Sequence, residues 1–139
     1  ANNVLAHVPS INDFISAFKR LLKTEGTISI EFPHLLAMVE KKEFDTIYHE
    51  HFFYFSLFTL KRIFSEHGLS IYDVDQLETH GGSLRIYVTH QGNSLDSKSD
   101  KKNVDKLIDV ELQNKMDSFD FYDPLLSGFW CGGRVVAVK

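Results

Sequence analysis

The spacing of hydrophobic and polar positions predicts a strand, a helix and a second strand at the start of the chain. Residues 3–8 form a short apolar run that predicts a buried strand. Apolar residues at helical spacing over 11–22 predict an amphipathic helix, with Ser10 as its N-cap and Asp13 in a capping-box position. Residues 27–32 predict the second strand. This order predicts a βαβ unit, whose two strands run parallel with a right-handed crossover.

The next part of the chain predicts a helix followed by a hairpin. Ser56 precedes an amphipathic helix that ends at His67 and Gly68, a residue pair typical of a helix C-terminus. Residues 71–77 and 84–88 predict two strands, and the connection between them is short enough for an antiparallel hairpin. The whole order is typical of an α/β, Rossmann-like, three-layer architecture. The second half of a class I methyltransferase sheet is one candidate among several mixed α/β folds.

The last part of the chain predicts a change in organisation. Residues 91–102 are polar and charged and predict an exposed connection, and 103–119 predict a further helix. The apolar residues 132–138 predict the start of a strand at the end of the sequence. We therefore predict one unit over 1–90, and a linker, helix and opening of a further domain over 91–139.

Composition excludes several classes of protein. The chain has 139 residues, a formal net charge of -4 and one cysteine, Cys131. The acidic balance argues against a nucleic-acid partner, because such proteins carry a basic face. No apolar run reaches the roughly 20 residues that a membrane-spanning helix needs. A single cysteine excludes an internal disulfide framework and suits the reducing cytoplasm. We expect a cytoplasmic domain without a membrane partner.

One stretch concentrates ionisable groups in an aromatic setting. Residues 44–54 contain two histidines, a glutamate and two tyrosines among phenylalanines, namely Tyr48, His49, Glu50, His51 and Tyr54. Histidine titrates near neutral pH, and a neighbouring carboxylate or apolar wall shifts its pKa. This stretch is therefore the first candidate for acid–base chemistry.

Three stretches of this chain resemble one enzyme family. They are residues 44–51 (Phe-Asp-Thr-Ile-Tyr-His-Glu-His) followed by Tyr54 and Ser56, residues 3–9 (Asn-Val-Leu-Ala-His-Val-Pro) and residues 79–85 (Thr-His-Gly-Gly-Ser-Leu-Arg). In order and spacing they resemble sugar C-methyltransferases that use S-adenosylmethionine to methylate C3 of a nucleotide-linked 4-keto deoxysugar. The resemblance implies a methyltransferase that acts on a nucleotide-sugar substrate.

The resemblance also implies that the chain is a fragment, truncated at both ends of the methyltransferase sheet. Family members begin with a cysteine-rich zinc domain and a glycine-rich cofactor loop, and they continue into a C-terminal Rossmann-like domain. This sequence has neither of the first two features. We therefore expect zinc only in the missing N-terminal domain and an inactive isolated chain, and we assign no cofactor-binding residue. Truncation exposes apolar surface, through which copies of the chain are expected to associate.

The resemblance assigns roles to seven residues. His51 is the base that removes a proton next to the ketone, Glu50 orients groups and stabilises positive charge, and Tyr48 hydrogen-bonds the enolate or sugar. His7 follows its strand and is expected to meet this loop across the cleft, since open α/β sheets bind ligands beyond the carboxyl ends of their strands. The expected substrate-binding residues are Tyr54, His80 and Arg85, and the arginine suits a diphosphate. His34, His67 and His90 receive no role.

Two other classes of function stay open from sequence alone. In an extended segment His49 and His51 point to the same side, and with Glu50 nearby they resemble metal ligands, with His7 or His80 as a distant third. The aromatic surface alternatively indicates a non-catalytic interaction module that contacts other domains or subunits.

Overall fold

The structure, a computed structural model, describes residues 1–122. Its strands are β1 (Ile28–Pro33), β2 (Leu69–Leu77) and β3 (Ser83–His90). Its α-helices are α1 (Ile11–Leu21), α2 (Leu35–Lys41), α3 (Leu57–Glu66), α4 (Ser94–Lys98) and α5 (Lys102–Gln113). Three short 3₁₀ turns are η1 (Leu5–His7), η2 (Phe44–Thr46) and η3 (Thr79–Gly81). Cys131 and the strand predicted at 132–138 lie outside the described residues.

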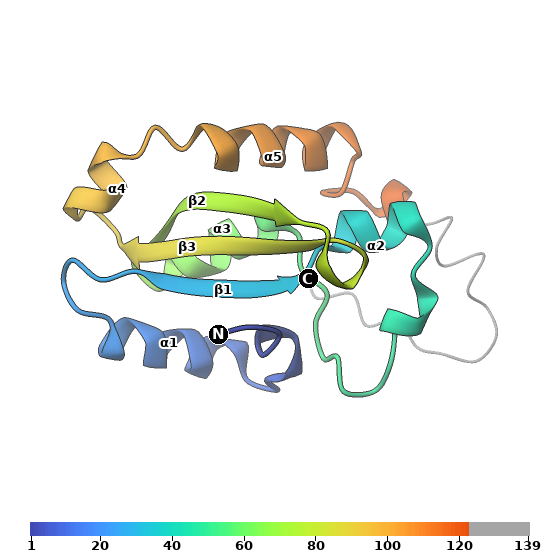
Figure 1. Cartoon of the computed structure of the whole chain (residues 1–139), viewed down its shortest axis with the longest axis horizontal. Helices are drawn as coiled ribbons and strands as arrows, with labels where there is room; N and C mark the ends of the chain where they lie inside the picture. Colours follow the sequence, from blue (N-terminus) through green and yellow to red (C-terminus); the bar gives the residue numbers. More distant parts are fainter. Residues whose placement is uncertain (123–139) are drawn as a thin grey trace.

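The three strands form one sheet in which β3 lies between β1 and β2. Both outer strands run antiparallel to β3, so they run parallel to each other. Ile30, Ile86 and Val74 lie opposite one another across the sheet, and all three are buried. α3 lies behind the sheet, while α1 and α5 run along its two edges (Figure 1). The predicted hairpin and the α/β fold class are confirmed.

The strand predicted at residues 3–8 is wrong over its whole length, since Leu5–His7 form η1 and no residue of 3–8 forms a β-bridge. Asn2 forms an isolated parallel bridge with Glu31 of β1, so the parallel relation expected of a βαβ unit holds at this one pair. Asn3 then adopts a left-handed conformation, with a φ of 53°. Asparagine tolerates this region better than most residues. The chain leaves the sheet there and turns into η1, which the hydrogen bond from His7 N to Val4 O closes at 3.0 Å.

The helix starts differ in how they are capped. Ser56 caps α3 as predicted, since its Oγ accepts a hydrogen bond from Thr59 N at 3.2 Å. Ser10 does not cap α1 through its side chain. Its hydroxyl donates to Asp13 Oδ2 at 2.7 Å, so the predicted capping box is wrong and the two side chains satisfy each other.

The C-terminal part of the described chain packs on the sheet. Residues 91–102, predicted as an exposed connection, contain α4, because the Asn93 side chain accepts a hydrogen bond from Asp96 N and caps this short helix. α5 contacts β2 and α3 and places Leu107 in the same hydrophobic core. The domain division at residue 90 stays a prediction. Within residues 1–122, no helix is long and apolar enough to cross a membrane.

Candidate active site

The histidine-rich stretch lies on the loop between α2 and α3, residues 42–56, which we call the site loop. Its chain turns at His51, whose backbone N donates to Tyr48 O at 3.0 Å. The His51 ring is held at both nitrogens. Nδ1 lies 2.9 Å from Thr46 O, and Nε2 lies 3.0 Å from the Tyr48 hydroxyl. A carbonyl only accepts, so Nδ1 carries the hydrogen, and the neutral ring has its lone pair on Nε2, where the Tyr48 hydroxyl donates.

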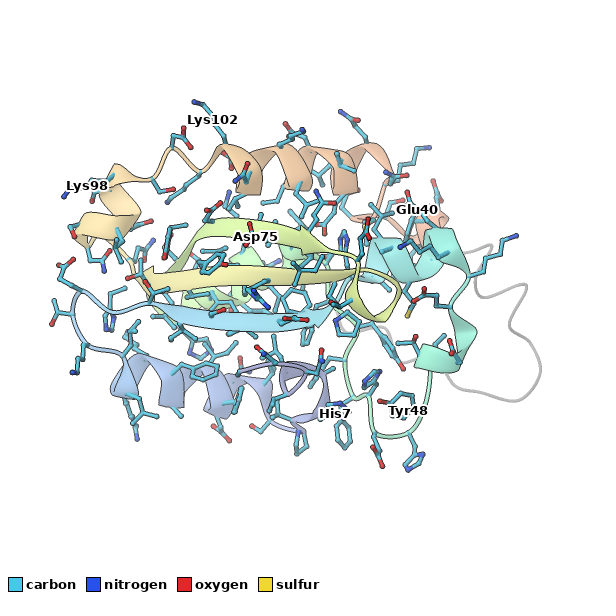
Figure 2. The ribbon with its side chains drawn as sticks, in the orientation of Figure 1. His7, Glu40, Tyr48, Asp75, Lys98 and Lys102 are labelled. Atoms are coloured by element: carbon cyan, nitrogen blue, oxygen red, sulfur yellow. The ribbon has the colours of Figure 1, made fainter. Side chains whose placement is uncertain are left out.

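His7 meets the site loop from the other end of the sequence. Its ring centroid lies 4.7 Å from that of His51 in an edge-on contact, and its Nδ1 donates to Glu50 O at 3.0 Å. Phe52 N donates to Ala6 O at 2.8 Å, which ties the loop to η1 through the backbone. Figure 2 shows His7 and Tyr48 close to each other, and their ring centroids are 6.4 Å apart. The predicted meeting of His7 with this loop is therefore seen in the geometry.

These side chains line a cleft of about 270 Å³. Asn3, Ala6 and His7 come from the N-terminal segment, Pro33 from the end of β1, and the rest from the site loop, namely Asp45, Thr46, Tyr48 and His51. A second hollow of about 310 Å³ lies at the end of α1, and Lys23 is the charged residue in its lining. It has no acid–base group other than that exposed lysine. The cleft at His51 is therefore the better candidate for chemistry.

Burial shifts the pKa of His51 and of Tyr54 in opposite directions. It lowers the pKa of His51, and the hydrogen bond to Thr46 O opposes this by raising it. The charge of His7 lowers the pKa of His51 further, and that of Glu50 raises it. Burial also raises the pKa of Tyr54, whose ring lies 5.8 Å from that of His51. At neutral pH the cleft therefore holds an imidazole that can accept a proton, beside phenols that can donate hydrogen bonds.

His49 and the carboxylate of Glu50 lie outside the cleft. Their side chains are 90% and 65% exposed, and His49 Nε2 lies 3.9 Å from Glu50 Oε1. The turn at this point, rather than the extended segment assumed from sequence, directs His49 away from His51. Within residues 1–122, no group of three histidine, cysteine, aspartate or glutamate side chains is arranged to hold a metal ion. The geometry therefore gives no support to the metal-site alternative.

The glycine turn after β2 supports the start of the site loop. Gly82 has a φ of 136°, and a Cβ there would lie 2.6 Å from the Cβ of Ala37 in α2. Gly81 O accepts a hydrogen bond from Lys41 Nζ, and Gly82 O accepts one from His34 N at 3.0 Å. Only glycine allows the turn to approach α2 this closely. The side chain of His80, in the same turn, lies outside what the structure describes.

Arg85 lies on the open polar face of the sheet and is already paired. Its Nη2 lies 2.7 Å from Glu31 Oε2, and the Glu31 side chain is 8% exposed. Thr79 donates to the other Glu31 oxygen at 3.1 Å. The hydrogen bond to Glu31 raises the pKa of Arg85 above its ordinary value. The geometry thus brings together His7, Tyr48, His51 and Tyr54, and it leaves Arg85 and the Glu50 carboxylate outside the cluster.

Two features of the cleft were not predicted from the sequence. The Thr46 carbonyl fixes the His51 ring, and a backbone group has no signal in sequence. Asn3 is among the residues that line the cleft, and its buried Oδ1 has no hydrogen-bond partner among the described residues. The position of Asn3 at the start of the motif at residues 3–9 was the available signal.

Known proteins match the chain in two stretches. Residues 1–74 match a family model described as a methyltransferase domain, and residues 78–127 match one described as a C-methyltransferase C-terminal domain. The C-methyltransferase NovU of Streptomyces niveus is 40% identical over 82 residues, which are 59% of this chain and 20% of NovU. The chain thus spans about a fifth of the length of that curated relative. Since the first model matches more than half of it, the chain belongs to the methyltransferase domain family.

Proposed function

We propose that the full-length protein is an S-adenosylmethionine-dependent C-methyltransferase that acts on a nucleotide-linked keto-deoxysugar, with His51 as the base. The observation that carries this proposal is the position of the His51 ring beside the cleft, with Nδ1 at Thr46 O and Nε2 at the Tyr48 hydroxyl. A base of lowered pKa is suited to removing a proton next to a ketone at neutral pH. The similarity to NovU supports methyl transfer to carbon.

The residues of this chain perform the proton-transfer half of the reaction. His51 Nε2 takes the proton from the carbon next to the ketone, and the C–H electron pair moves into the enolate. For this step the Tyr48 hydroxyl turns from Nε2 to the ketone oxygen, which frees the Nε2 lone pair, and it then donates to the enolate oxygen that forms. Glu50 contributes through its charge, which favours the imidazolium that forms.

The cleft residues fit this half of the reaction, and we assign none of them to hold the cofactor. S-adenosylmethionine, when bound, supplies an electrophilic methyl group to the carbon nucleophile. The roles of Tyr54, His80 and Arg85 in holding the nucleotide sugar stay part of the proposal. For Arg85, a substrate diphosphate would have to compete with the Glu31 carboxylate.

Exchange of the substrate proton tests the proposal without the cofactor. The full-length protein is incubated in D₂O with a nucleotide-linked 4-keto deoxysugar, and deuterium at the carbon next to the ketone is followed by NMR. We expect exchange, and after S-adenosylmethionine is added, a product methylated on that carbon. The His51→Asn variant should lose exchange, while the His49→Asn variant should keep it. Absence of exchange, or methylation on oxygen, would contradict the proposal.

A second candidate function is supported by exposed apolar residues around the cleft. Phe52 is 55% exposed, Ile47 42% and Val4 41%, and they come from the site loop and the N-terminal segment. Such residues favour contact with another part of the full-length protein or with a second copy. Light scattering of the full-length protein and of a Phe52→Ser, Ile47→Ser variant tests self-association, which a change in mass would support and an unchanged monomer would contradict.

A further inference from the structure

A buried carboxylate outside the cleft joins the two ends of the segment 34–58, which contains α2 and the site loop. Glu111 lies in the last turn of α5 and is fully buried, with 0% of its surface exposed. Oε1 accepts from Leu57 N at 2.7 Å, and Oε2 accepts from Phe58 N at 2.8 Å. These are the first two backbone donors of α3, and Ser56 satisfies the third. Glu111 therefore completes the cap of α3 from a distant helix, where a negative charge also meets the positive end of the helix dipole.

The same carboxylate holds the residue from which α2 begins. His34 Nε2 lies 2.8 Å from Glu111 Oε1, and both side chains are buried. Because both carboxylate oxygens accept from backbone N–H groups, the His34 nitrogen is the donor in this pair. His34 is also bridged to Phe55, and Leu35 N donates to Phe55 O at 3.0 Å. The residues just before α2 therefore lie next to the residues just before α3. Glu111 contacts both the start of α2, through His34, and the first turn of α3.

This arrangement connects α5 to the geometry of His51. Figure 1 shows the C-terminal end of α5 next to α2, from which the site loop continues. His51 lies between the two anchored ends, and its partners Thr46 and Tyr48 belong to the same loop. The loop contacts the N-terminal segment through Phe52 and Glu50. If the ends of the segment 34–58 separate, the base moves relative to His7 and the cleft.

We propose that Glu111 is a positioning residue that clamps both ends of the segment 34–58, which carries the site loop, and so fixes His51 against His7. This inference rests on the proposed function of His51 as the base. A misplacement of a catalytic group by about 1 Å can lower a rate by up to roughly 100-fold. We therefore expect Glu111→Gln to lower kcat about tenfold or more with little change in KM. Glutamine replaces one of the two accepting oxygens with an NH₂ group, which only donates, so one backbone N–H of α3 loses its acceptor.

Leu107→Ala is the matched control, since Leu107 lies one turn earlier on α5, is buried in the same core and has no polar group. Both variants of the full-length protein are compared well below their unfolding temperatures. Hydrogen exchange of residues 44–55 should become at least about tenfold faster in Glu111→Gln than in Leu107→Ala. Equal exchange in the two variants, with kcat within twofold of each other, would overturn the proposal.

A second variant keeps the test decisive if Glu111→Gln does not fold. His34→Phe leaves Glu111 bonded to α3 and releases only the start of the segment 34–58. It should also speed exchange over 44–55 and lower kcat, and wild-type exchange and kcat would overturn the clamp. The exchange measurement does not depend on methyl transfer. A protein without any methyltransferase activity but with the expected exchange would therefore contradict the proposed function and support the clamp.

Discussion

Residues 1–122 contain two histidine–glutamate pairs that differ in almost every physical respect. His49 and Glu50 are neighbours in sequence, yet their charged atoms are 3.9 Å apart and their side chains are 90% and 65% exposed. His34 and Glu111 are 77 residues apart, and their atoms meet at 2.8 Å with side chains 6% and 0% exposed. The pair that is conspicuous in sequence is solvated, and the pair that sequence does not reveal is buried.

The difference shows how burial, rather than proximity in sequence, decides what such a pair does. An exposed ion pair contributes about 0–1 kcal/mol, because water and salt screen it. A buried carboxylate must have its acceptors satisfied, since removing its partners leaves a desolvated group behind. Glu111 meets this requirement with two backbone donors and a histidine. The carboxylate of Glu50 is exposed to solvent and does not face this requirement. His51 lies between these extremes, buried enough for a lowered pKa and open to a cleft.

The largest expected effect separates His51 from His49. His51→Asn should lower kcat of the full-length protein by about 10³-fold, a usual loss for a general base. Binding of S-adenosylmethionine, measured by calorimetry, should be unchanged. His49→Asn is the control and should keep kcat within twofold, because its side chain is exposed and outside the cleft. A His51→Asn variant with the wild-type rate would show that the base is another group.

The next effect compares the two glutamates through stability. Glu111→Gln should lower the free energy of unfolding by about 3 kcal/mol, because it breaks a buried network and leaves a backbone donor unpaired. Glu50→Gln should change it by less than about 0.5 kcal/mol. Urea denaturation of the full-length protein followed by circular dichroism measures both. Equal losses in the two variants would mean that burial does not distinguish the pairs.

Sequence patterns predicted the parts of this fold that local interactions determine. α3 begins at Ser56 and the β2–β3 hairpin forms as predicted, because a capping hydroxyl and alternating apolar residues act over a few positions. The strand predicted at 3–8 was wrong. The apolar residues after Asn3 are buried in η1, and their pattern in sequence is the same as that of a buried strand. The short helix α4 was missed because five residues are too few for a clear helical period.

The candidate site was predictable to a similar extent. The resemblance named His7, Tyr48 and His51, and the position of His7 at a predicted strand end indicated the same edge of the sheet. Backbone partners and long-range contacts could not be predicted. The Thr46 carbonyl that fixes the tautomer of His51 has no side-chain signal. In sequence, Glu111 cannot be distinguished from the other charged residues of an amphipathic helix. Its contact with His34 exists only in the folded chain.

A smaller effect is expected from the hydroxyl that joins Tyr48 to His51. Tyr48→Phe should lower kcat by up to about fivefold, since a lost hydrogen bond of about 1 kcal/mol is partly replaced by water at this residue, which is 41% exposed. Tyr54→Phe is a suitable comparison, because its ring lies edge-on to His51 at 5.8 Å. Steady-state kinetics with each variant measure the two losses, and a larger loss for Tyr54→Phe would move the enolate-binding role to that residue.

The smallest effect concerns the pH at which His51 loses activity. Burial holds the pKa of His51 below the ordinary histidine value, so the neutral base persists as the pH falls through that value. The acid limb of the kcat/KM profile should therefore lie below the ordinary histidine pKa.

The negative charge of Glu50 raises the pKa of His51, so Glu50→Gln should move this limb to still lower pH, by no more than about half a pH unit at low salt. High salt should remove most of this difference, because the carboxylate is exposed. A shift to higher pH would contradict the stated effect of the Glu50 charge on His51. A shift to lower pH that persists in high salt would show that Glu50 acts on His51 from inside the cleft and not through solvent, and the contrast between the two glutamates would then fail.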